Sequence, residues 1–245
     1  MAQALKPEIF VEKDYETLSR KAAEFLLSEI LAPKEKPFSV ALSGGSTPKR
    51  LYEILGSEEF KHRILWERVH FFWGDERCVP PTDPESNFKM AWDVWLFKLS
   101  LPEGNIHRFK GELDPESAAL AYEEELRSFF GSVLFPTFDF ILLGLGPDGH
   151  TASLFPETTA LYEKKRWAVS NFVPKFGKNR LTLTYPVLNS AKIVAFLVSG
   201  KEKADKVASV LNGDSSLPAT GVRPHSGRLV WFLDKEAGEK ISELF

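Results

Sequence analysis

The stretch from Phe138 to Pro156 constrains this chain of 245 residues more than any other. It opens with an apolar run, Phe138 to Leu143, whose length suits a buried strand. The run then breaks into three glycines, a proline, Asp148 and His150. Because ligands of open α/β sheets bind at the carboxyl ends of the strands, this ending predicts a functional site beside His150. We expect residues 151–155 to turn as a short helix.

Apolar runs of similar length recur along the chain and alternate with amphipathic stretches. Strands are predicted at residues 38–42, 69–73, 167–170, 181–185, 193–198 and 228–233. Helices are predicted at residues 14–31, 49–55, 88–99, 115–130, 201–211 and 235–244. This alternation predicts an α/β fold, a three-layer Rossmann-like open sheet that is mostly parallel and has helices on both faces. No linker or repeat interrupts it, so we expect residues 1–245 to form a single domain.

Composition narrows the classes of partner. The net charge is -3, which gives no general basic surface for nucleic acid, so any anionic ligand needs a local group of cations. Cys78 is the only cysteine, which excludes an intrachain disulfide and a cysteine-rich metal site. We expect its thiol to be buried and unreactive. The chain start lacks the apolar core of a signal peptide, and no stretch reaches the length of a membrane span. These features predict a cytoplasmic protein without a membrane partner, and we expect a monomer.

A second strand also ends in glycines. Residues 38–42 run directly into Ser43, Gly44, Gly45, Ser46 and Thr47, with Pro48 next and a helix after it. Glycines allow close backbone approach, hydroxyls donate hydrogen bonds, and the positive end of a helix dipole attracts anions. The turn therefore predicts a phosphate site, although a tight turn with an ordinary helix cap is the simpler alternative. The Gly-Lys-Ser/Thr ending of a nucleotide-triphosphate loop is missing.

The strand predicted at residues 69–73 leads into Gly74, Asp75, Glu76 and Arg77. Read alone, this segment would be a solvated loop with an Asp–Arg pair. Its place after a strand makes Arg77 a candidate to hold an anionic substrate or a developing oxyanion, with Asp75 as a substrate ligand. Asp75 and Glu76 have no third metal ligand at suitable local spacing, so we predict no metal site.

Three other features are interpreted as surface. His62 and His107 stand in no recognisable motif, and we expect both to be ordinary surface residues. The run Glu123-Glu124-Glu125 lies inside a predicted helix and is assigned to its solvated face.

The central loop matches two common motifs poorly. Residues 144–149 fit G-x-G-x-x-G, but no acidic residue ends the next predicted strand and Pro156 breaks the segment that should form a long helix. No G-x-S-x-G nucleophile elbow occurs. What remains is His150, a natural general base near neutral pH, with Asp148 positioned to orient its ring. The alternative is that His150 only packs the turn.

Taken together, these motifs resemble the 6-phosphogluconolactonase family, within the superfamily that also holds the glucosamine-6-phosphate isomerases. The resemblance covers nearly the whole chain, and its longest motif is Gly-Leu-Gly-Pro-Asp-Gly-His-Thr-Ala-Ser-Leu-Phe-Pro at 144–156. The other matching segments are residues 42–48, 74–80, 86–87, 180–184 and 200–204. The chain departs from the family pattern at residues 219–224 and in a polar approach to Arg180 at residues 175–179.

Two other functions are weighed against this resemblance. The amino-sugar-phosphate isomerase/deaminase branch usually carries a glutamate where this chain has Phe155, and Asp-Glu-Tyr where this chain has Asp75, Glu76 and Arg77. A non-catalytic sugar-phosphate sensor domain would need a helix-turn-helix segment, and residues 14–31 supply one helix only.

The resemblance implies hydrolysis of 6-phospho-D-glucono-1,5-lactone to 6-phospho-D-gluconate, a step of the oxidative pentose phosphate pathway. It implies that His150 activates water, Asp148 orients it, and no covalent intermediate, metal or cofactor takes part. Arg77 serves either the oxyanion or the phosphate. The phosphate of this small-molecule partner is expected on residues 43–47, with Arg180 and Lys201 as counter-charges.

Overall fold

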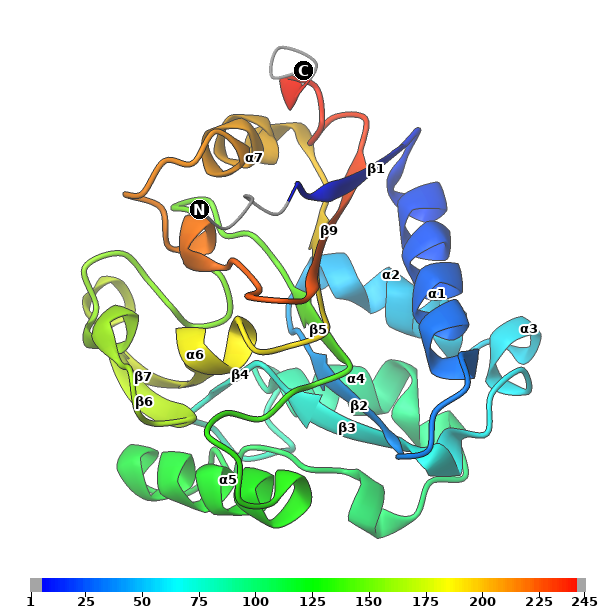
Figure 1. The fold of residues 1–245 in the computed structure, drawn as a ribbon, viewed down its shortest axis with the longest axis vertical. Helices are drawn as coiled ribbons and strands as arrows, with labels where there is room; N and C mark the ends of the chain where they lie inside the picture. The colour runs from blue at the N-terminus through cyan, green and yellow to red at the C-terminus, as the bar shows by residue number, and fades with distance from the viewer. Residues whose placement is uncertain (1–5, 242–245) are drawn as a thin grey trace.

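The computed structural model describes residues 6–241, and its centre is a parallel sheet of six strands. The strands lie in the order β1-β9-β8-β5-β2-β3, and every neighbouring pair is parallel. Their bounds are β1 Glu8–Glu12, β2 Phe38–Leu42, β3 Val69–Trp73, β5 Phe140–Leu143, β8 Ile193–Val198 and β9 Arg228–Asp234. The predicted α/β fold with a mostly parallel sheet is confirmed (Figure 1).

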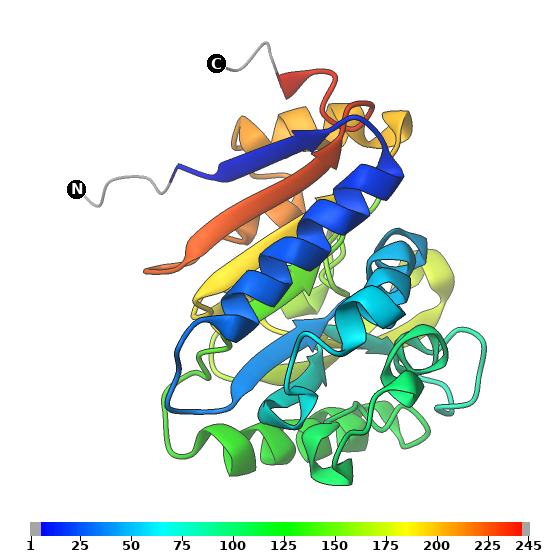
Figure 2. The ribbon, with the colours of Figure 1, turned by 90° about the vertical axis from the view of Figure 1, so that its right-hand side faces the viewer.

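Helices cover the sheet on both sides, as Figures 1 and 2 show. Helices α1 and α2 lie on one side, and α6 and α7 lie on the other (Figure 1). Their bounds are α1 Tyr15–Leu31, α2 Ser46–Leu55, α3 Glu58–Lys61, α4 Asn87–Val94, α5 Pro115–Phe130, α6 Tyr185–Leu188 and α7 Ala204–Leu211. Two of the starts are fixed by aspartates: the carboxylates of Asp14 and Asp114 accept backbone hydrogen bonds from the first turns of α1 and α5.

A small second sheet was not predicted. It is antiparallel, in the order β4-β7-β6, with β4 at Asp75–Arg77, β6 at Ala168–Val173 and β7 at Lys178–Leu183. The placement of β6 and β7 among the parallel strands was therefore wrong. The turn between them, residues 174–177, is too short for a parallel crossover and permits only a hairpin. Strand β4 is short and carries only charged side chains, so no apolar run marks it.

Several predicted elements end differently in the structure. Residues 151–155 form a tight turn instead of a helix, because Ala152 has a φ of 47° and Thr151 pairs with Leu154. The helix expected over residues 88–99 breaks at Trp95. The last predicted helix, 235–244, is a series of turns through residue 240, and residues 242–244 lie outside the described residues. Strand β1 was missed because polar residues flank its short apolar segment.

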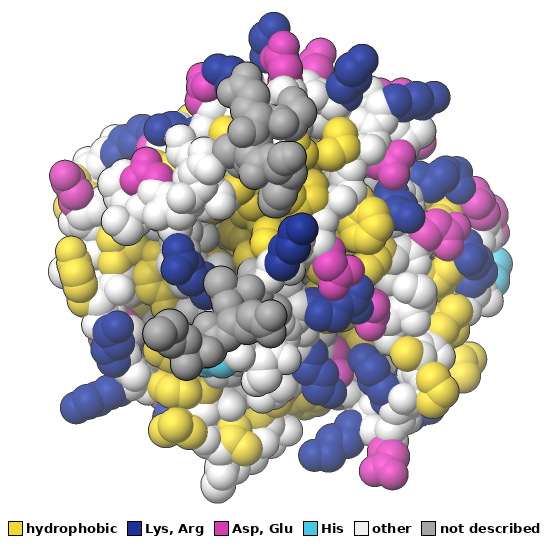
Figure 3. Space-filling model, turned by 45° about the horizontal axis from the view of Figure 1, so that its top comes forward, with side chains coloured by type: hydrophobic (Ala, Val, Ile, Leu, Met, Phe, Trp, Pro, Cys, Tyr) yellow, Lys and Arg dark blue, Asp and Glu magenta, His cyan; other side chains and the backbone are white. Residues whose placement is uncertain are grey.

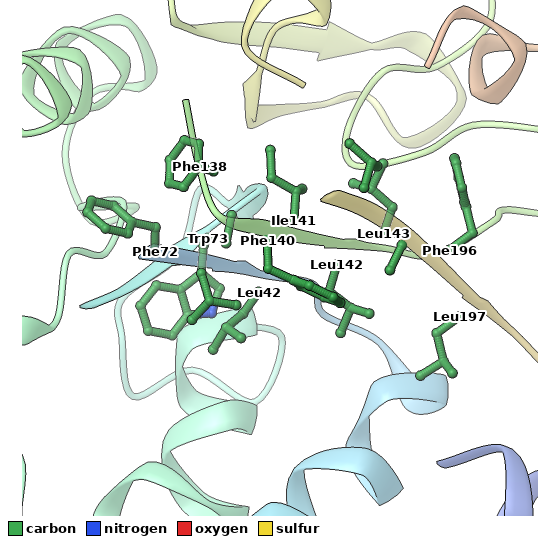
Figure 4. Close-up of a cluster of buried hydrophobic side chains, with 14 of the residues drawn as sticks. Leu42, Phe72, Trp73, Phe138, Phe140, Ile141, Leu142, Leu143, Phe196 and Leu197 are labelled. Atoms are coloured by element: carbon green, nitrogen blue, oxygen red, sulfur yellow. The ribbon is translucent and has the colours of Figure 1, made fainter. Parts of the chain in front are cut away.

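The core lies on both faces of the central strands (Figure 4). Phe140 and Leu142 point to the side of α2 and α4, and Ile141 points to the opposite side. All three, and Leu143, are essentially inaccessible to solvent. A strand buried on both faces reads as a continuous apolar run, which explains why the sequence located β5 so well.

Two side chains that were assigned to the surface are buried. His107 is 8% exposed and lies between His70, at 2.9 Å, and the Glu125 carboxylate, at 2.6 Å. Glu123 is 7% exposed and accepts hydrogen bonds from Arg166 and Arg127. The prediction for His107 was wrong because its partners, His70 and Glu125, come from other elements. The prediction for the run 123–125 was wrong only for Glu123, because Glu124 and Glu125 are exposed. His62 is exposed, as predicted.

The surface view in Figure 3 shows acidic and basic side chains interspersed over one face. No large area of one sign stands out there, which agrees with the small net charge. Within residues 6–241, no helix combines the length and apolarity that crossing a bilayer requires.

Candidate active site

One cavity of about 520 Å³ opens at the carboxyl ends of the central strands. Its walls are turns that directly follow strands: residues 43–48 after β2, residues 144–152 after β5, and residues 199–203 after β8. Asp75 and Arg77 of β4 complete the lining together with Asn87. The topology explains this convergence, because parallel strands bring their carboxyl ends to the same edge of a sheet.

The turn after β2 is shaped for close approach of a ligand. Gly45 has a φ of 93°, which a residue with a side chain rarely adopts, and α2 starts immediately after it. No side chain caps this helix, so the backbone N–H groups of its first turn, which borders the cavity, have no side-chain partner. The hydroxyl of Tyr15 donates to the carbonyl groups of Ser46 and Thr47 and fixes the turn. This geometry suits an anion such as a phosphate.

Gly44 is required by packing. A Cβ at this position would lie 1.8 Å from Oδ1 of Asn87, which is itself buried. The side-chain amide of Asn87 donates to the backbone carbonyl of Asp75 at 2.9 Å. The glycine-rich turn is thereby fastened to β4, the strand that carries Arg77.

His150 belongs to the loop after β5 and lines the same cavity as the turn after β2. Its Nδ1 atom is hydrogen-bonded to Oδ1 of Asp148. The backbone N–H of Gly146 donates to the His150 carbonyl at 2.8 Å, and a Cβ on Gly146 would lie 2.0 Å from Nδ1. The ring of Phe155 stacks on the imidazole, with centroids 3.9 Å apart. Loop and ring together leave His150 little freedom to turn.

The two members of this pair titrate in a way that suits a base. Burial by itself would raise the pKa of Asp148, but His150 and Lys175 lower it to about 2, so the carboxylate is ionised near neutral pH. An ionised carboxylate at Nδ1 requires the proton on that nitrogen and leaves the lone pair on Nε2. Burial lowers the pKa of His150 below its ordinary value, although Asp148 opposes this shift. The imidazole is thus neutral at physiological pH.

Positive charge in the site comes from different elements. Arg77 of β4 lines the cavity and is paired in register with Arg180 of β7. Burial lowers the pKa of Arg180, and the neighbouring Arg77 lowers it further. Lys203, from the turn after β8, adds a second cation to the lining. Adjacent cations of this kind favour an anionic ligand.

Asp75 is held by two donors at the floor of the site. Its Oδ2 accepts a hydrogen bond from Ser153 at 2.7 Å, and its Oδ1 accepts one from Asn87 at 3.3 Å. Only 9% of the residue is exposed, yet it contributes to the cavity wall. A carboxylate fixed in this way can accept a hydrogen bond from a ligand hydroxyl.

The residues predicted from the sequence are distributed as follows. The cavity lining includes Ser43, Gly44, Gly45, Ser46, Thr47, Asp75, Arg77 and His150. Asp148 and Arg180 lie directly behind this lining, in contact with His150 and beside Arg77. Lys201 is not brought to the cavity: its side chain is 75% exposed and its Nζ lies 3.6 Å from Glu239.

Several site residues were not singled out. Lys203 takes the place expected of Lys201, and both belong to the Gly-Lys-Glu-Lys segment that the family pattern marks. Asn87 follows a recognised helix-start signal, whereas the contacts of Ser153 and Lys175 depend on the fold alone. The thiol of Cys78 is only partly buried, and burial raises its pKa, so it is protonated at neutral pH.

Comparison with known proteins gives one consistent picture. The model of the family described as glucosamine-6-phosphate isomerases/6-phosphogluconolactonase matches residues 13–231. A 6-phosphogluconolactonase of Synechocystis sp. is 45% identical over 210 residues, which is 83% of this chain and 84% of that protein. A 6-phosphogluconolactonase of Nostoc sp. is 38% identical over 97% of this chain and 100% of that protein. The structure of 6-phosphogluconolactonase from Trypanosoma cruzi superimposes with a TM-score of 0.87, at 31% identity over 98% of each chain.

Proposed function

This chain belongs to the glucosamine-6-phosphate isomerases/6-phosphogluconolactonase family and is a hydrolase of its lactonase branch, and from this premise we propose that it hydrolyses 6-phospho-D-glucono-1,5-lactone with His150 as general base. One observation carries the proposal. The same cavity is lined by a neutral imidazole, paired with an ionised carboxylate, and by a glycine-rich turn at the start of α2 that suits a phosphate. A phosphorylated lactone needs both.

In the proposed reaction, Nε2 of His150 takes a proton from water as the water oxygen attacks the lactone carbonyl carbon. The tetrahedral intermediate collapses when the bond from that carbon to the ring oxygen breaks, and the ring oxygen receives the proton from the imidazolium. One water is consumed, the ring opens, and the product is 6-phospho-D-gluconate. Asp148 stabilises the transient imidazolium and keeps the ring oriented. Because an ester carbonyl is already electrophilic, the mechanism uses no covalent enzyme intermediate.

Binding energy comes from the far end of the substrate. The phosphate lies on the backbone N–H groups and hydroxyls of residues 43–47, with Lys203 as a nearby counter-charge. Holding the phosphate there positions the lactone carbon beside His150, which raises the effective concentration of reacting groups. Arg77, reinforced by Arg180, is able to serve either phosphate or oxyanion, because a guanidinium binds both kinds of oxygen.

The packing of His150 favours the lactonase over the isomerase/deaminase branch. Phe155, which stands in place of the glutamate typical of that branch, stacks on the imidazole and supplies no acid or base. The pair His150–Asp148 is thus the ionisable centre next to the carbonyl, which matches hydrolysis.

The proposal is tested with purified protein and freshly prepared 6-phosphogluconolactone. Acid formation is followed continuously, spontaneous hydrolysis is subtracted, and ammonia release from glucosamine 6-phosphate is measured in parallel. We expect fast lactone hydrolysis, no ammonia, and loss of the enzymatic rate in His150→Gln. Ammonia release with little lactone hydrolysis would place the chain in the deaminase branch. Binding of 6-phosphogluconate without turnover of either substrate would indicate a sensor.

A further inference from the structure

The hairpin that joins β6 to β7 reaches the catalytic pair from outside the cavity. Its turn is a single 3-10 segment, Pro174–Phe176, closed by Gly177 with a φ of 58°. The N–H of Gly177 donates to the carbonyl of Pro174 at 3.1 Å. Because the left-handed region favours glycine, this closure fixes where the side chains of Lys175 and Phe176 project.

Lys175 shares the carboxylate of Asp148 with His150. Its Nζ atom lies 3.1 Å from Oδ2 of Asp148, while Oδ1 of the same carboxylate is hydrogen-bonded to Nδ1 of His150. Both oxygens of Asp148 are therefore engaged, one by the base and one by a cation. A carboxylate bonded on one oxygen only would be free to rotate about its last torsion, whereas two partners on different elements fix its plane.

Phe176 supports one face of the imidazole through one intermediate ring. Its ring meets Phe155 edge to face, with centroids 5.6 Å apart and an interplanar angle of 86°. Phe155 in turn stacks on His150. Two consecutive residues of one turn thus contact the two supports of the same imidazole, the carboxylate and the stacked ring.

We propose that the β6–β7 turn is a positioning element of the active site, and that Lys175 holds Asp148 in the orientation that keeps His150 a neutral, correctly aligned base. Lys175 does not line the cavity and is not expected to touch substrate. This role rests on the proposed function of His150. The arrangement of Lys175, Asp148 and His150 is independent of that function. In this proposal, Lys175 gives a role to the segment 175–179, where the chain departs from the family pattern.

The sign of the electrostatic effect follows from the charges around His150. Desolvation lowers the pKa of His150. The carboxylates of Asp148 and Asp75 raise this pKa, and the Lys175 charge lowers it. Removing the lysine charge leaves the two carboxylates unopposed, so the pKa of His150 rises and less neutral imidazole is present at a given acidic pH. Lys175 is 55% exposed, so salt weakens its influence, with a Debye length of about 3 Å at about 1 M salt.

The test compares Lys175→Met, which keeps the length of the side chain, with Lys175→Arg and Lys178→Met. Lys178 is a matched control because it lies on the same hairpin, is similarly exposed and faces Glu85 instead of Asp148. In Lys175→Met we expect kcat to fall about three- to tenfold with KM changed less than about twofold, since a half-exposed charge acts weakly at a distance. The acidic limb of kcat/KM should move to higher pH. Lys175→Arg should restore most of the loss, and high salt should narrow the gap between wild type and Lys175→Met.

An NMR titration of the imidazole rings separates this proposal from the proposed function. The chain has five histidines, and His150→Gln identifies the resonance of His150. The midpoint of His150 should rise in Lys175→Met and stay unchanged in Lys178→Met, whether or not the lactone is the substrate. If the protein failed to hydrolyse lactone but this midpoint moved, only the proposed function would fall. An unmoved midpoint, or a Lys175→Met variant that differs from wild type in KM alone, would overturn the positioning role.

Discussion

His150 has two ring nitrogens with different surroundings, and the proposed chemistry depends on the difference. Nδ1 is committed to the Asp148 carboxylate, while the ring as a whole borders the cavity. Since Asp148 is ionised, the proton belongs on Nδ1 and the accepting lone pair on Nε2. Burial makes the neutral imidazole the stable form at neutral pH. At the scale of a residue, a common side chain becomes a base because its environment fixes both its charge and its tautomer.

This arrangement predicts the pH dependence of the enzyme. Only neutral imidazole can accept a proton from water, so kcat/KM should rise as pH increases through the pKa of His150 and then level off. Because that pKa is lowered, the midpoint should lie below the ordinary value of about 6.5. His150→Gln should lower kcat about 10²- to 10⁴-fold, with much less change in KM, and should abolish the acidic limb. Initial rates between about pH 5 and about pH 8 test this, after subtraction of spontaneous hydrolysis. A His150→Gln variant that keeps the limb would show that another group is the base.

At the scale of an element, the turn after β8 shows how a shift of two residues along the chain decides a role. Lys201 and Lys203 belong to the same 3-10 turn at the start of α7, two residues apart. Lys203 lines the cavity, and Lys201 faces Glu239 on the solvent side. In a 3-10 helix, successive residues point about 120° apart, so neighbours in sequence have different surroundings.

The turn predicts opposite outcomes for two equivalent substitutions. Lys203→Met removes a cation from the phosphate-binding wall and should raise KM about three- to tenfold, with kcat nearly unchanged. Lys201→Met should leave both constants within about twofold of wild type, since an exposed pair with Glu239 contributes little. Methionine keeps the apolar stem of lysine, which limits effects on packing. Michaelis–Menten kinetics on both variants decide the matter, and a larger KM effect in Lys201→Met would reverse the assignment.

The same elements show what sequence can and cannot specify. The buried strand β5 and the glycine-rich ends of β2 and β5 were located because apolar runs and glycines are local signals. The antiparallel pairing of β6 with β7 and the brief strand β4 depend on contacts between distant segments. For the same reason the sequence pointed to residues 43–47 and His150 but not to Ser153 or Lys175, which reach the site only through the fold.

At the scale of the whole molecule, the edge of the sheet opposite the cavity is held by one buried carboxylate. Asp139 precedes β5, is 6% exposed, and accepts hydrogen bonds from the backbone N–H and hydroxyl of Ser39 in β2. Lys34 and Lys192 lie 3.2 and 2.9 Å from it. The carboxylate therefore connects β2 and β5 with the segment that enters β8. Asp139 lies at the amino ends of these strands, whereas the turns that line the cavity begin at their carboxyl ends.

This connection predicts a pH-dependent loss of stability in Asp139→Asn. Burial alone would raise the pKa of Asp139, but Lys192, Ser39 and Lys34 hold it below its ordinary value. The carboxylate thus stabilises the fold fully above its unfolded pKa of about 3.9, and this contribution is lost as pH falls through the folded pKa. At neutral pH the variant should lose about 1–3 kcal/mol of unfolding free energy, because the hydrogen bonds from Ser39 lose their charged acceptor and the partly buried Lys34 loses its counter-charge. The difference from wild type should shrink toward acid, where wild type is protonated as well.

Urea unfolding of Asp139→Asn at neutral and acidic pH measures this difference, with Asp93→Asn as the control. Asp93 pairs with Lys89 on the exposed side of α4 and should change the unfolding free energy by less than about 0.5 kcal/mol. Lactone hydrolysis by Asp139→Asn should be unchanged where the variant is folded, since the carboxylate is absent from the cavity lining. Equal effects of the two substitutions, or a difference that persists unchanged in acid, would mean that the ionised form of Asp139 does not hold these strands together.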